Sequence, residues 1–432
     1  MKLAIKIVLS FILLSIHSLS GQEKLTLEDA IGIALKNNHQ INIARNNAKI
    51  ANNNVNIGNA NLLPKIDALS SATYQDNSVP GNQSSQQETF TLNNAQLQVS
   101  YTLFDGFNNI YQFNKLKLSG QIGDLEARNK IENTLYRVSN GYFNTALARE
   151  NLTIANELLS ISHERLERAK KRSNYGQANT IEVLSAQVDL NSDSVTVVNA
   201  KLFWEQSRRD LILLLNFEPE REFEVDTKVT FVYNMSLPEL SEAALKNNSS
   251  FLTSINRYKQ SKVDLKIARS NFSPQLSVQA SYGYNQTNPD LNINLNDPSK
   301  TIYAGATLSL NLFNGFKNHI QKQNAKISVN SQELAQEEAR LDLINIVVNS
   351  YEAYKNSLTV LNLEQKNLDV AELNFKRTQE LYNLGQVTTT QFREAQLNLI
   401  KAKNSISTAK FNAKLYEIEL MRLSGQLITE AN

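Results

Sequence analysis

Few residues in this chain have the types and the spacing that catalysis requires. Ser407 and Lys410 form a Ser-x-x-Lys pair, in which a serine acts as the nucleophile. The pair lies inside a predicted helix, and the sequence lacks the Ser-Asp-Asn and Lys-Thr-Gly segments that such a site needs. The four histidines, at positions 17, 39, 163 and 319, lie in different segments. We therefore expect no catalytic residue.

The composition excludes several further kinds of chemistry. The 432 residues include no Cys, which excludes thiolate metal sites, iron–sulfur clusters and thiol nucleophiles. No phosphate-binding loop or His-Glu-x-x-His segment is present. The 44 Lys and Arg residues nearly balance the 42 Asp and Glu residues, so the charge does not favour a nucleic-acid partner. We expect no metal, no cofactor and no nucleic acid.

The N-terminus predicts export. Lys2 and Lys6 precede an apolar run over residues 7–16, and the small residues Ser18 and Ser20 follow it. This pattern is typical of a secretory signal peptide, which we place at residues 1–20. The run is shorter than the roughly 20 residues that cross a bilayer as a helix. Because no Cys follows the cleavage position, we expect no lipid anchor.

The remaining sequence is one unit repeated twice. Ala-Leu-Lys-Asn-Asn at residues 34–38 recurs at 244–248, a shift of 210 positions. Leu-Phe-Asp-Gly-Phe at 103–107 recurs as Leu-Phe-Asn-Gly-Phe at 312–316, a shift of 209. The shift of 209 also relates Tyr142 to Tyr351, Gly176 to Gly385 and Gln187 to Gln396. We assign residues 21–216 to the first repeat, 217–236 to a linker near the equator of the molecule, and 237–432 to the second repeat.

Both repeats predict the same order of elements. A helix begins near Thr26 or Pro238 and runs to the region before Pro64 or Pro274, where proline ends it. Strands are expected at 66–75, 95–104, 275–285 and 301–312. Long helices are expected over 106–173 and 315–382, and shorter ones over 178–215 and 389–424. At 1.5 Å per residue each long helix would extend about 100 Å, so we expect a column of helices rather than a compact core.

The long helices carry a coiled-coil pattern. In the second repeat, apolar or aromatic residues recur mostly in steps of three and four at positions 341, 344, 348, 351, 354, 358, 361 and 368. A second apolar stripe, at positions 346, 347, 360, 363 and 370, predicts that each helix packs on two neighbours in a ring. A two-stranded fibrous coiled coil is the alternative, and the predicted strands argue against it.

The strands alternate between apolar and uncharged polar residues. Leu276, Val278 and Ala280 alternate with Ser277 and Gln279, and the segments 95–103 and 302–312 behave likewise. Such runs of about ten residues are typical of a membrane β-barrel, whereas the outer face of a soluble sheet would normally carry Lys and Glu. Four strands cannot close a barrel, because the smallest membrane barrels have eight. Several copies must share one barrel, with eight strands from two copies or twelve from three.

Together these features resemble the TolC-like outer-membrane efflux proteins over residues 21–432. The motifs that carry the resemblance lie at residues 25–30, 34–38, 62–64, 103–107, 175–177 and 181–187. It implies a mainly α fold with a membrane β-barrel, in which a homotrimer forms a twelve-stranded barrel continuous with an α-helical tunnel. It also implies an outer-membrane channel that exports small molecules or proteins from the periplasm, embedded in outer-membrane lipid. The expected partners are a periplasmic adaptor (membrane fusion) protein and an inner-membrane pump.

Three groups of residues are candidate functional sites. Glycine permits a turn from strand to helix, and aromatic residues favour the membrane–water boundary, so we expect a barrel–helix junction at the periplasmic rim. It comprises Pro64, Phe104, Gly106, Phe107, Pro274, Phe313, Gly315 and Phe316. By resemblance, the adaptor-contacting tips are Tyr175, Gly176, Gln177, Leu384, Gly385 and Gln386. Also by resemblance, the periplasmic gate comprises Gln391, Glu394 and Glu182.

A different class of function remains open from the residues alone. The same helices would suit a non-channel periplasmic or outer-membrane coiled-coil spacer, or an adhesin. An adhesin would be expected to have larger exposed loops than those predicted at 76–94 and 285–300. A channel conducts ions across a planar bilayer, and an adhesin does not.

Overall fold

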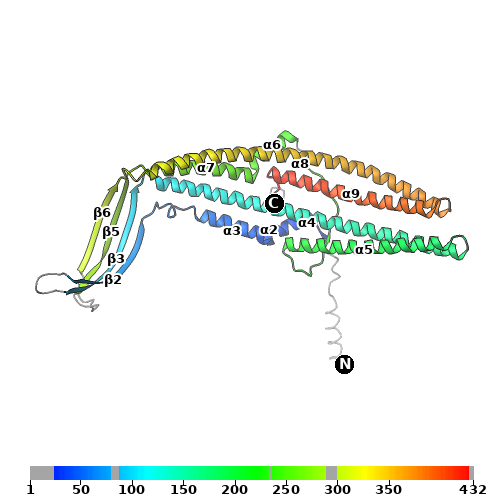
Figure 1. Cartoon of the computed structure of the whole chain (residues 1–432), viewed down its shortest axis with the longest axis horizontal. Helices are drawn as coiled ribbons and strands as arrows, with labels where there is room; N and C mark the ends of the chain where they lie inside the picture. Colours follow the sequence, from blue (N-terminus) through cyan, green and yellow to red (C-terminus); the bar gives the residue numbers. More distant parts are fainter. Residues whose placement is uncertain (1–23, 79–86, 233–235, 289–298, 428–432) are drawn as a thin grey trace, which may run out of the picture. The chain divides into compact units, whose positions relative to one another are not determined.

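The computed structural model describes residues 24–78, 87–232, 236–288 and 299–427 (Figure 1). The predicted signal peptide at 1–20 therefore lies outside the described residues. The chain divides into two compact units. We call residues 1–44, 128–248 and 342–432 the helical unit, and residues 45–127 and 249–341 the sheet unit. Each unit contains segments of both repeats, so the compact units do not follow the repeat boundaries.

The sheet unit contains one antiparallel sheet of four strands in the order β2-β3-β5-β6 (Figure 1). The strands are β2 (Lys65–Ser78), β3 (Gln87–Phe104), β5 (Gln275–Asn288) and β6 (Ser299–Ser309). The pairing of β3 with β5 joins the two repeats, with Val99 opposite Ala280. Ile66, Leu97 and Ile302 are exposed, so one apolar face of the sheet is uncovered within the chain.

The strand bounds differ from those expected. Pairing of β2 with β3 continues to Ser78 opposite Gln87, so the predicted loop at 76–94 was too long. A backbone ladder needs no apolar side chains, and the polar residues at 75–78 pair as readily as the alternating ones. Strand β6 ends at Ser309, short of the expected 312. Its last partner is Gln275, and Pro274 before it has no N–H to donate.

The long helices are α4 (Asn108–Asn174) and α8 (Lys317–Asn383), each of 67 residues. Both begin two residues later than expected, because the two residues before each start have positive φ. These angles are 67° at Gly106 and Phe107, 64° at Gly315 and 65° at Phe316. A residue with positive φ cannot continue a right-handed helix. The shorter helices are α5 (Thr180–Leu215) and α9 (Thr389–Leu423).

The single first helix expected in each repeat is wrong, because an asparagine divides it. The first repeat has α2 (Leu27–Asn37) and α3 (His39–Asn53), and the second has α6 (Leu237–Asn247) and α7 (Ser249–Ser270). Asn38 is extended, and its Oδ1 accepts hydrogen bonds from the N–H groups of Gln40 (2.9 Å) and Ile41 (3.3 Å). Its Nδ2 donates to the Leu214 carbonyl at 2.7 Å. Asn248 donates likewise to the Leu423 carbonyl at 3.1 Å, so the break belongs to both repeats.

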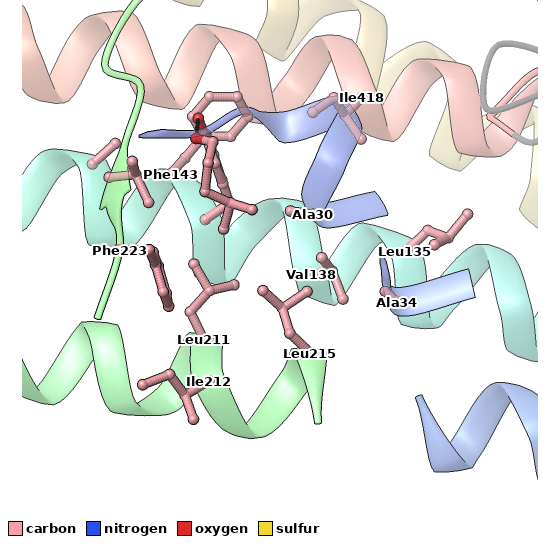
Figure 2. Packing of buried hydrophobic residues seen from close by; sticks show 14 of the residues in the cluster. Ala30, Ala34, Leu135, Val138, Phe143, Leu211, Ile212, Leu215, Phe223 and Ile418 are labelled. Carbon is pink, nitrogen blue, oxygen red and sulfur yellow. Dashed lines mark hydrogen bonds between the residues drawn. The ribbon is translucent and has the colours of Figure 1, made fainter. Parts of the chain in front are cut away.

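The core of the helical unit surrounds Tyr142 and Phe143 of α4. Figure 2 shows side chains of α2, α4, α5 and α9 converging there, with Leu211, Leu215 and Ile418 among them. The Tyr142 hydroxyl lies 3.0 Å from the Leu25 carbonyl and 2.9 Å from the Asp226 carbonyl. It thereby ties the short strand β1 (Lys24–Leu25) to β4 (Glu224–Val225), its parallel partner. Burial raises the pKa of Tyr142, so the hydroxyl stays protonated and remains a donor.

None of the helices in the described residues combines the length and the hydrophobicity needed to span a membrane.

Candidate functional site

The two predicted tips are open glycine turns. The φ angles of Gly176 and Gly385 are +71° and +75°. In the first tip, the Gln177 N–H donates to the Arg172 carbonyl at 2.8 Å, and the Gly176 N–H donates to Ser173 at 2.9 Å. The same two bonds recur in the second tip, and this pattern is the Schellman motif that ends helices. A Cβ atom on either glycine would meet no heavy atom within 4 Å, so the space beside both turns is empty.

The helix that follows each tip begins with a side-chain cap. Asn179 caps α5 by accepting the Glu182 N–H at 3.0 Å. Thr388 caps α9, and its hydroxyl oxygen accepts the Gln391 N–H at 3.2 Å. In return, Gln391 Oε1 accepts the Thr388 N–H at 2.9 Å, which completes a capping box. Gln391, one of the expected gate residues, thus stabilises the start of α9.

The other two expected gate residues have different surroundings. Glu182 forms an ion pair with Arg172 of α4 at 3.0 Å, and its side chain is only 15% exposed. Glu394 is exposed, and it lines a cavity of about 530 Å³ together with Arg165, Asp189 and Arg393. The structure therefore pairs Glu182 with α4 and leaves the Glu394 carboxylate accessible.

Beside this cavity lies a buried ion-pair cluster that the sequence reasoning missed. We call it the Arg393 cluster; it comprises Ser162, Arg165, Asp189, Asp193, Arg393 and Gln396. The two terminal nitrogens of Arg393 each donate to one Asp193 carboxylate oxygen at 2.7 Å, in a bidentate pair. Asp193 is 2% exposed and Gln396 is fully buried. The cluster joins α4, α5 and α9 within the helical unit.

The remaining contacts of the cluster balance most of its charge. Gln396 donates to the hydroxyl of Ser162 at 3.1 Å and to the Leu158 carbonyl at 3.3 Å. Arg165 bonds Asp189 through one nitrogen, while its Nε and Nη1 have no hydrogen-bond partner in the described structure. Burial alone would lower the pKa of Arg393, but the hydrogen bonds that it donates to Asp193 and the charges of both aspartates raise it. The Arg393 guanidinium therefore stays charged.

One signal in the sequence could have revealed the cluster. Arg393 occupies the position in the second repeat that Leu184 occupies in the first, and Asp193 corresponds to Ala402. A charged residue at a position that is apolar in the other repeat indicates a specific partner, as polar residues at coiled-coil seams do. The periodicity alone gave no partner for Arg393.

An aromatic stack lies near the second tip. The ring of Tyr382 stacks on Phe392, with ring centroids 4.5 Å apart and planes at 20°. Burial raises the pKa of Tyr382, and the charge of Glu182 raises it further. The stack joins the end of α8 to the first turn of α9, so it stiffens the hairpin that carries Gly385.

The expected junction residues lie between strand and helix in both repeats. The rings of Phe104 and Phe107 meet edge to face at 5.5 Å, and those of Phe313 and Phe316 do so at 5.3 Å. Pro64 and Pro274 immediately precede β2 and β5. Near these junctions the sheet unit has a cavity of about 720 Å³, lined mainly by Asn, Ser and Gln side chains.

The residues considered for catalysis serve helix packing. Ser407 is buried within α9, and Lys410 Nζ lies 2.5 Å from the Glu150 carboxylate of α4. In the part of the chain that the structure describes, no group of three or more His, Asp or Glu side chains is placed to bind a metal ion.

A chain with an uncovered four-stranded sheet and duplicated long helices that end in open turns has the design of an outer-membrane channel protein. Residues 30–216 and 240–426 match the family described as outer membrane efflux protein. The chain therefore belongs to this family. It is an outer-membrane protein that serves efflux.

Individual relatives are distant in sequence. The chain is 23% identical to "Probable outer membrane lipoprotein SilC" of Salmonella typhimurium, over 91% of this chain and 84% of the relative. It is 22% identical to outer membrane protein TolC of Vibrio cholerae, over 68% of each. The crystal structure of the Campylobacter jejuni CmeC outer membrane channel superposes with a TM-score of 0.79 at 18% identity, covering 93% of this chain and 86% of that one. At that identity the similarity to CmeC shows a shared fold.

Proposed function

We propose that three copies of this chain form one conduit through the outer membrane and the periplasm. The single observation that carries the proposal is the four-stranded sheet with two free edges, β2 and β6. In lipid, every backbone donor and acceptor needs a partner, so the edges must pair with those of other copies. Three copies supply twelve strands, enough to enclose a lumen, whereas eight strands would be filled by side chains. The polar faces of the strands, on which Lys65 and Asp67 form an ion pair at 3.0 Å among uncharged polar residues, suit a wet interior.

The helices would continue this conduit into the periplasm as a tunnel. The open space beside Gly176 and Gly385 suits contact with a periplasmic adaptor, since a partner can approach the backbone there closely. The adaptor would in turn join the channel to an inner-membrane pump. The linker at 217–236 would lie near the equator of the assembled molecule, and the aromatic pairs at the junctions near the periplasmic rim of the barrel.

The gate is proposed at the start of α9. If the exposed Glu394 faces the axis of the assembly, three copies bring three carboxylates together. Such a ring of carboxylates attracts cations to the constriction. Gln391 and Glu182 would hold the helix starts in place through the capping box and the Arg172 pair. The chain would then act by passage alone, with no catalytic residue and no cofactor.

Planar-bilayer recording tests the proposed function. Protein purified in detergent should insert and give discrete single-channel steps, as a water-filled conduit requires. Heat-denatured protein at the same concentration is the control. Insertion without conductance, by protein that is otherwise folded, would favour the spacer or adhesin instead.

A further inference from the structure

The sequence contains two Asn-Gly pairs, Asn140-Gly141 and Asn314-Gly315. An Asn-Gly pair can react with itself, because glycine has no Cβ atom to hinder its backbone nitrogen as that nitrogen approaches the asparagine side chain. Attack on the Cγ carbon closes a five-membered succinimide ring and releases the side-chain nitrogen as ammonia. The backbone and the surroundings of each pair decide whether the folded protein permits this attack, and the two pairs differ in both.

Asn314-Gly315 lies in an open turn directly before α8, outside any helix or strand. The φ angle of Gly315 is +64°, and a Cβ atom there would meet no heavy atom within 4 Å, so nothing packs against this glycine. Within the residues that the structure describes, neither the N–H of Gly315 nor the side-chain nitrogen of Asn314 has a hydrogen-bond partner. No contact therefore restrains the attacking nitrogen or the leaving nitrogen.

The start of α8 polarises the carbonyl that would be attacked. The N–H of Asn318, the second residue of the helix, donates to Oδ1 of Asn314 at 3.3 Å. Negative charge develops on this oxygen when a nucleophile adds to Cγ, and a fixed N–H aimed at such an oxygen stabilises the charge. The positive end of the helix dipole acts in the same direction. The fold therefore lowers the barrier to attack at Asn314.

Asn140-Gly141 lacks these conditions, although its sequence is the same. Both residues lie within α4, where each backbone N–H donates to a carbonyl one turn earlier. A Cβ atom on Gly141 would lie 2.8 Å from Cδ1 of Leu214, so α5 packs closely on this glycine. The Asn140 side chain accepts a hydrogen bond from the Asn144 side chain at 2.7 Å. This pair is held in one conformation and serves as a control within the same chain.

The first repeat shows that an aspartate fits at this position. The residue that corresponds to Asn314 is Asp105, which precedes α4 as Asn314 precedes α8. Oδ2 of Asp105 accepts the N–H of Asn109 at 2.9 Å, as Oδ1 of Asn314 accepts the N–H of Asn318. A carboxylate is more favourable there than an amide, because its negative charge lies at the positive end of the helix.

The surroundings of Asn314 also accommodate an additional negative charge. Asn314 lines the cavity of about 720 Å³ in the sheet unit, and the charged residues of that lining are Lys65, Lys317 and Asp105. Two cationic side chains and one anionic side chain thus line the cavity. A carboxylate at position 314 would balance their charge.

We propose that Asn314 converts to aspartate in the folded protein, so that α8 gains the carboxylate that α4 has from the start. The backbone nitrogen of Gly315 bonds to Cγ, its proton leaves with Nδ2 as ammonia, and a succinimide forms. Water then adds to the Cγ carbonyl, the bond between Cγ and the Gly315 nitrogen breaks, and that nitrogen regains a proton. One water is consumed, one ammonia is released, and nothing is oxidised or reduced. The conversion needs only one chain and is independent of the proposed channel.

The N–H of Asn318 also determines which product forms. Water can open the succinimide at either of its two carbonyls. Opening at Cγ gives aspartate with a normal backbone, whereas opening at the former backbone carbonyl gives isoaspartate, whose backbone contains an additional CH₂ group. Because the N–H points to the oxygen on Cγ, it activates that carbonyl in the second step as in the first. Aspartate is therefore the main product.

Mass spectrometry of proteolytic peptides tests the conversion, because the exchange of NH₂ for OH raises the mass of the peptide. Detergent-solubilised protein is isolated soon after synthesis and incubated at neutral pH, in parallel with protein unfolded in guanidinium chloride. In folded protein, at isolation or during incubation, we expect Asn314 to become mainly aspartate and Asn140 to stay unchanged. In the denaturant both asparagines should convert, and isoaspartate should be the main product.

Three results would overturn the proposal. The first is an Asn314 that stays intact in folded protein over the time in which it converts in denaturant. The second is isoaspartate as the main product in folded protein. The third is equal conversion of Asn314 and Asn140 in folded protein, because the structure would then select neither pair.

Two variants at position 318 separate the backbone N–H from the side chain. Asn318→Ala keeps the N–H and Asn318→Pro removes it, and proline is tolerated in the first turn of a helix. Both variants lose the hydrogen bond from the Asn318 side chain to the Asn271 carbonyl at 3.0 Å, so that loss cancels in the comparison. We expect the proline variant to convert several-fold more slowly than the alanine variant, with a larger share of isoaspartate. Equal rates and products in the two variants would show that the start of α8 does not direct the reaction.

Discussion

At the scale of single residues, the ion pair of the Arg393 cluster can be replaced by the residues that stand at the equivalent positions of the other repeat. Removing one member of a buried bidentate pair leaves its partner as an uncompensated buried charge, which lowers the free energy of unfolding by roughly 3–5 kcal/mol. We therefore expect Asp193→Ala to lower the thermal unfolding midpoint of the detergent-solubilised protein, measured by circular dichroism. Adding Arg393→Leu installs the residues that stand at the equivalent positions, Ala402 and Leu184. The double variant should recover most of the loss.

The exposed pair Arg377–Glu380 is the matched control for this double-variant series. Its side chains are 71% and 49% exposed, and such surface pairs contribute little to stability. Arg377→Gln should leave the unfolding midpoint unchanged. If the double variant is no more stable than Asp193→Ala alone, the loss of stability does not come from leaving Arg393 as an unpaired buried charge.

Glu394 is the residue on which proposed ion selectivity depends. We expect Glu394→Gln to weaken the preference for cations and any block by multivalent cations, because it removes a ring of charge from the constriction. Reversal potentials in asymmetric salt measure the preference. Glu182→Gln is the comparison, since the Glu182 carboxylate is already paired with Arg172. Unchanged selectivity in Glu394→Gln would mean that Glu394 does not line the constriction.

At the scale of elements, substitutions at the two tips distinguish the effect of backbone strain from the effect of side-chain bulk. Gly176→Ala and Gly176→Trp carry the same φ penalty, roughly 1–2 kcal/mol, because both place a Cβ at φ +71°. Only tryptophan fills the empty space beside the turn. We expect Gly176→Trp and Gly385→Trp to abolish export while the trimers remain intact, whereas the alanine variants retain most export. Export assays with crosslinked or native-gel trimers as the assembly readout check both. Normal export from both tryptophan variants would rule out contact at the tips.

The break at Asn38 is a second element-scale prediction. Asn38→Ala removes a helix cap and the bond to the Leu214 carbonyl, so we expect a loss of about 2 kcal/mol in stability. Asn37→Ala, one position earlier, is the control and should have a small effect. Thermal unfolding of both variants gives the comparison. Equal midpoints would show that the break is held by other contacts.

The same elements show how far sequence reasoning reached. Glycine and proline positions located α4, α5, α8 and α9 to within two residues, because these residues act on the local backbone alone. At the break, Asn38 caps α3 locally, but it also bonds a carbonyl 176 residues away, and no local pattern signals that contact. The Arg393 cluster was missed for the same reason, since its members come from three helices. The ends of the strands depend on the strand with which they pair. Strand β6 ends at Ser309 because its partner strand β5 begins at Gln275, directly after Pro274.

At the scale of the whole molecule, the free edges of the sheet predict a single assembly size. We expect the detergent-solubilised protein to have three times the protomer mass, as measured by light scattering after correction for detergent. Ile327 of α8 is apolar and 57% exposed within the chain, so Ile327→Asp should weaken contact with another copy and shift the protein to smaller species. Lys326→Asp, at the neighbouring position, is the control. A stable species of two or four copies would contradict the twelve-stranded barrel.

The pairing of β1 with β4 has a consequence for biogenesis. Lys24 lies opposite Glu224, so the first strand finds its partner only after 200 further residues (224 − 24) have emerged. During export the N-terminal segment therefore stays unpaired until β4 has emerged, with Leu25 and the apolar face of α2 exposed to solvent. Long-range pairing of this kind slows folding and leaves the nascent chain open to aggregation. A periplasmic holdase that shields the first segment would then govern the yield of folded protein more than the stability of the finished protein does.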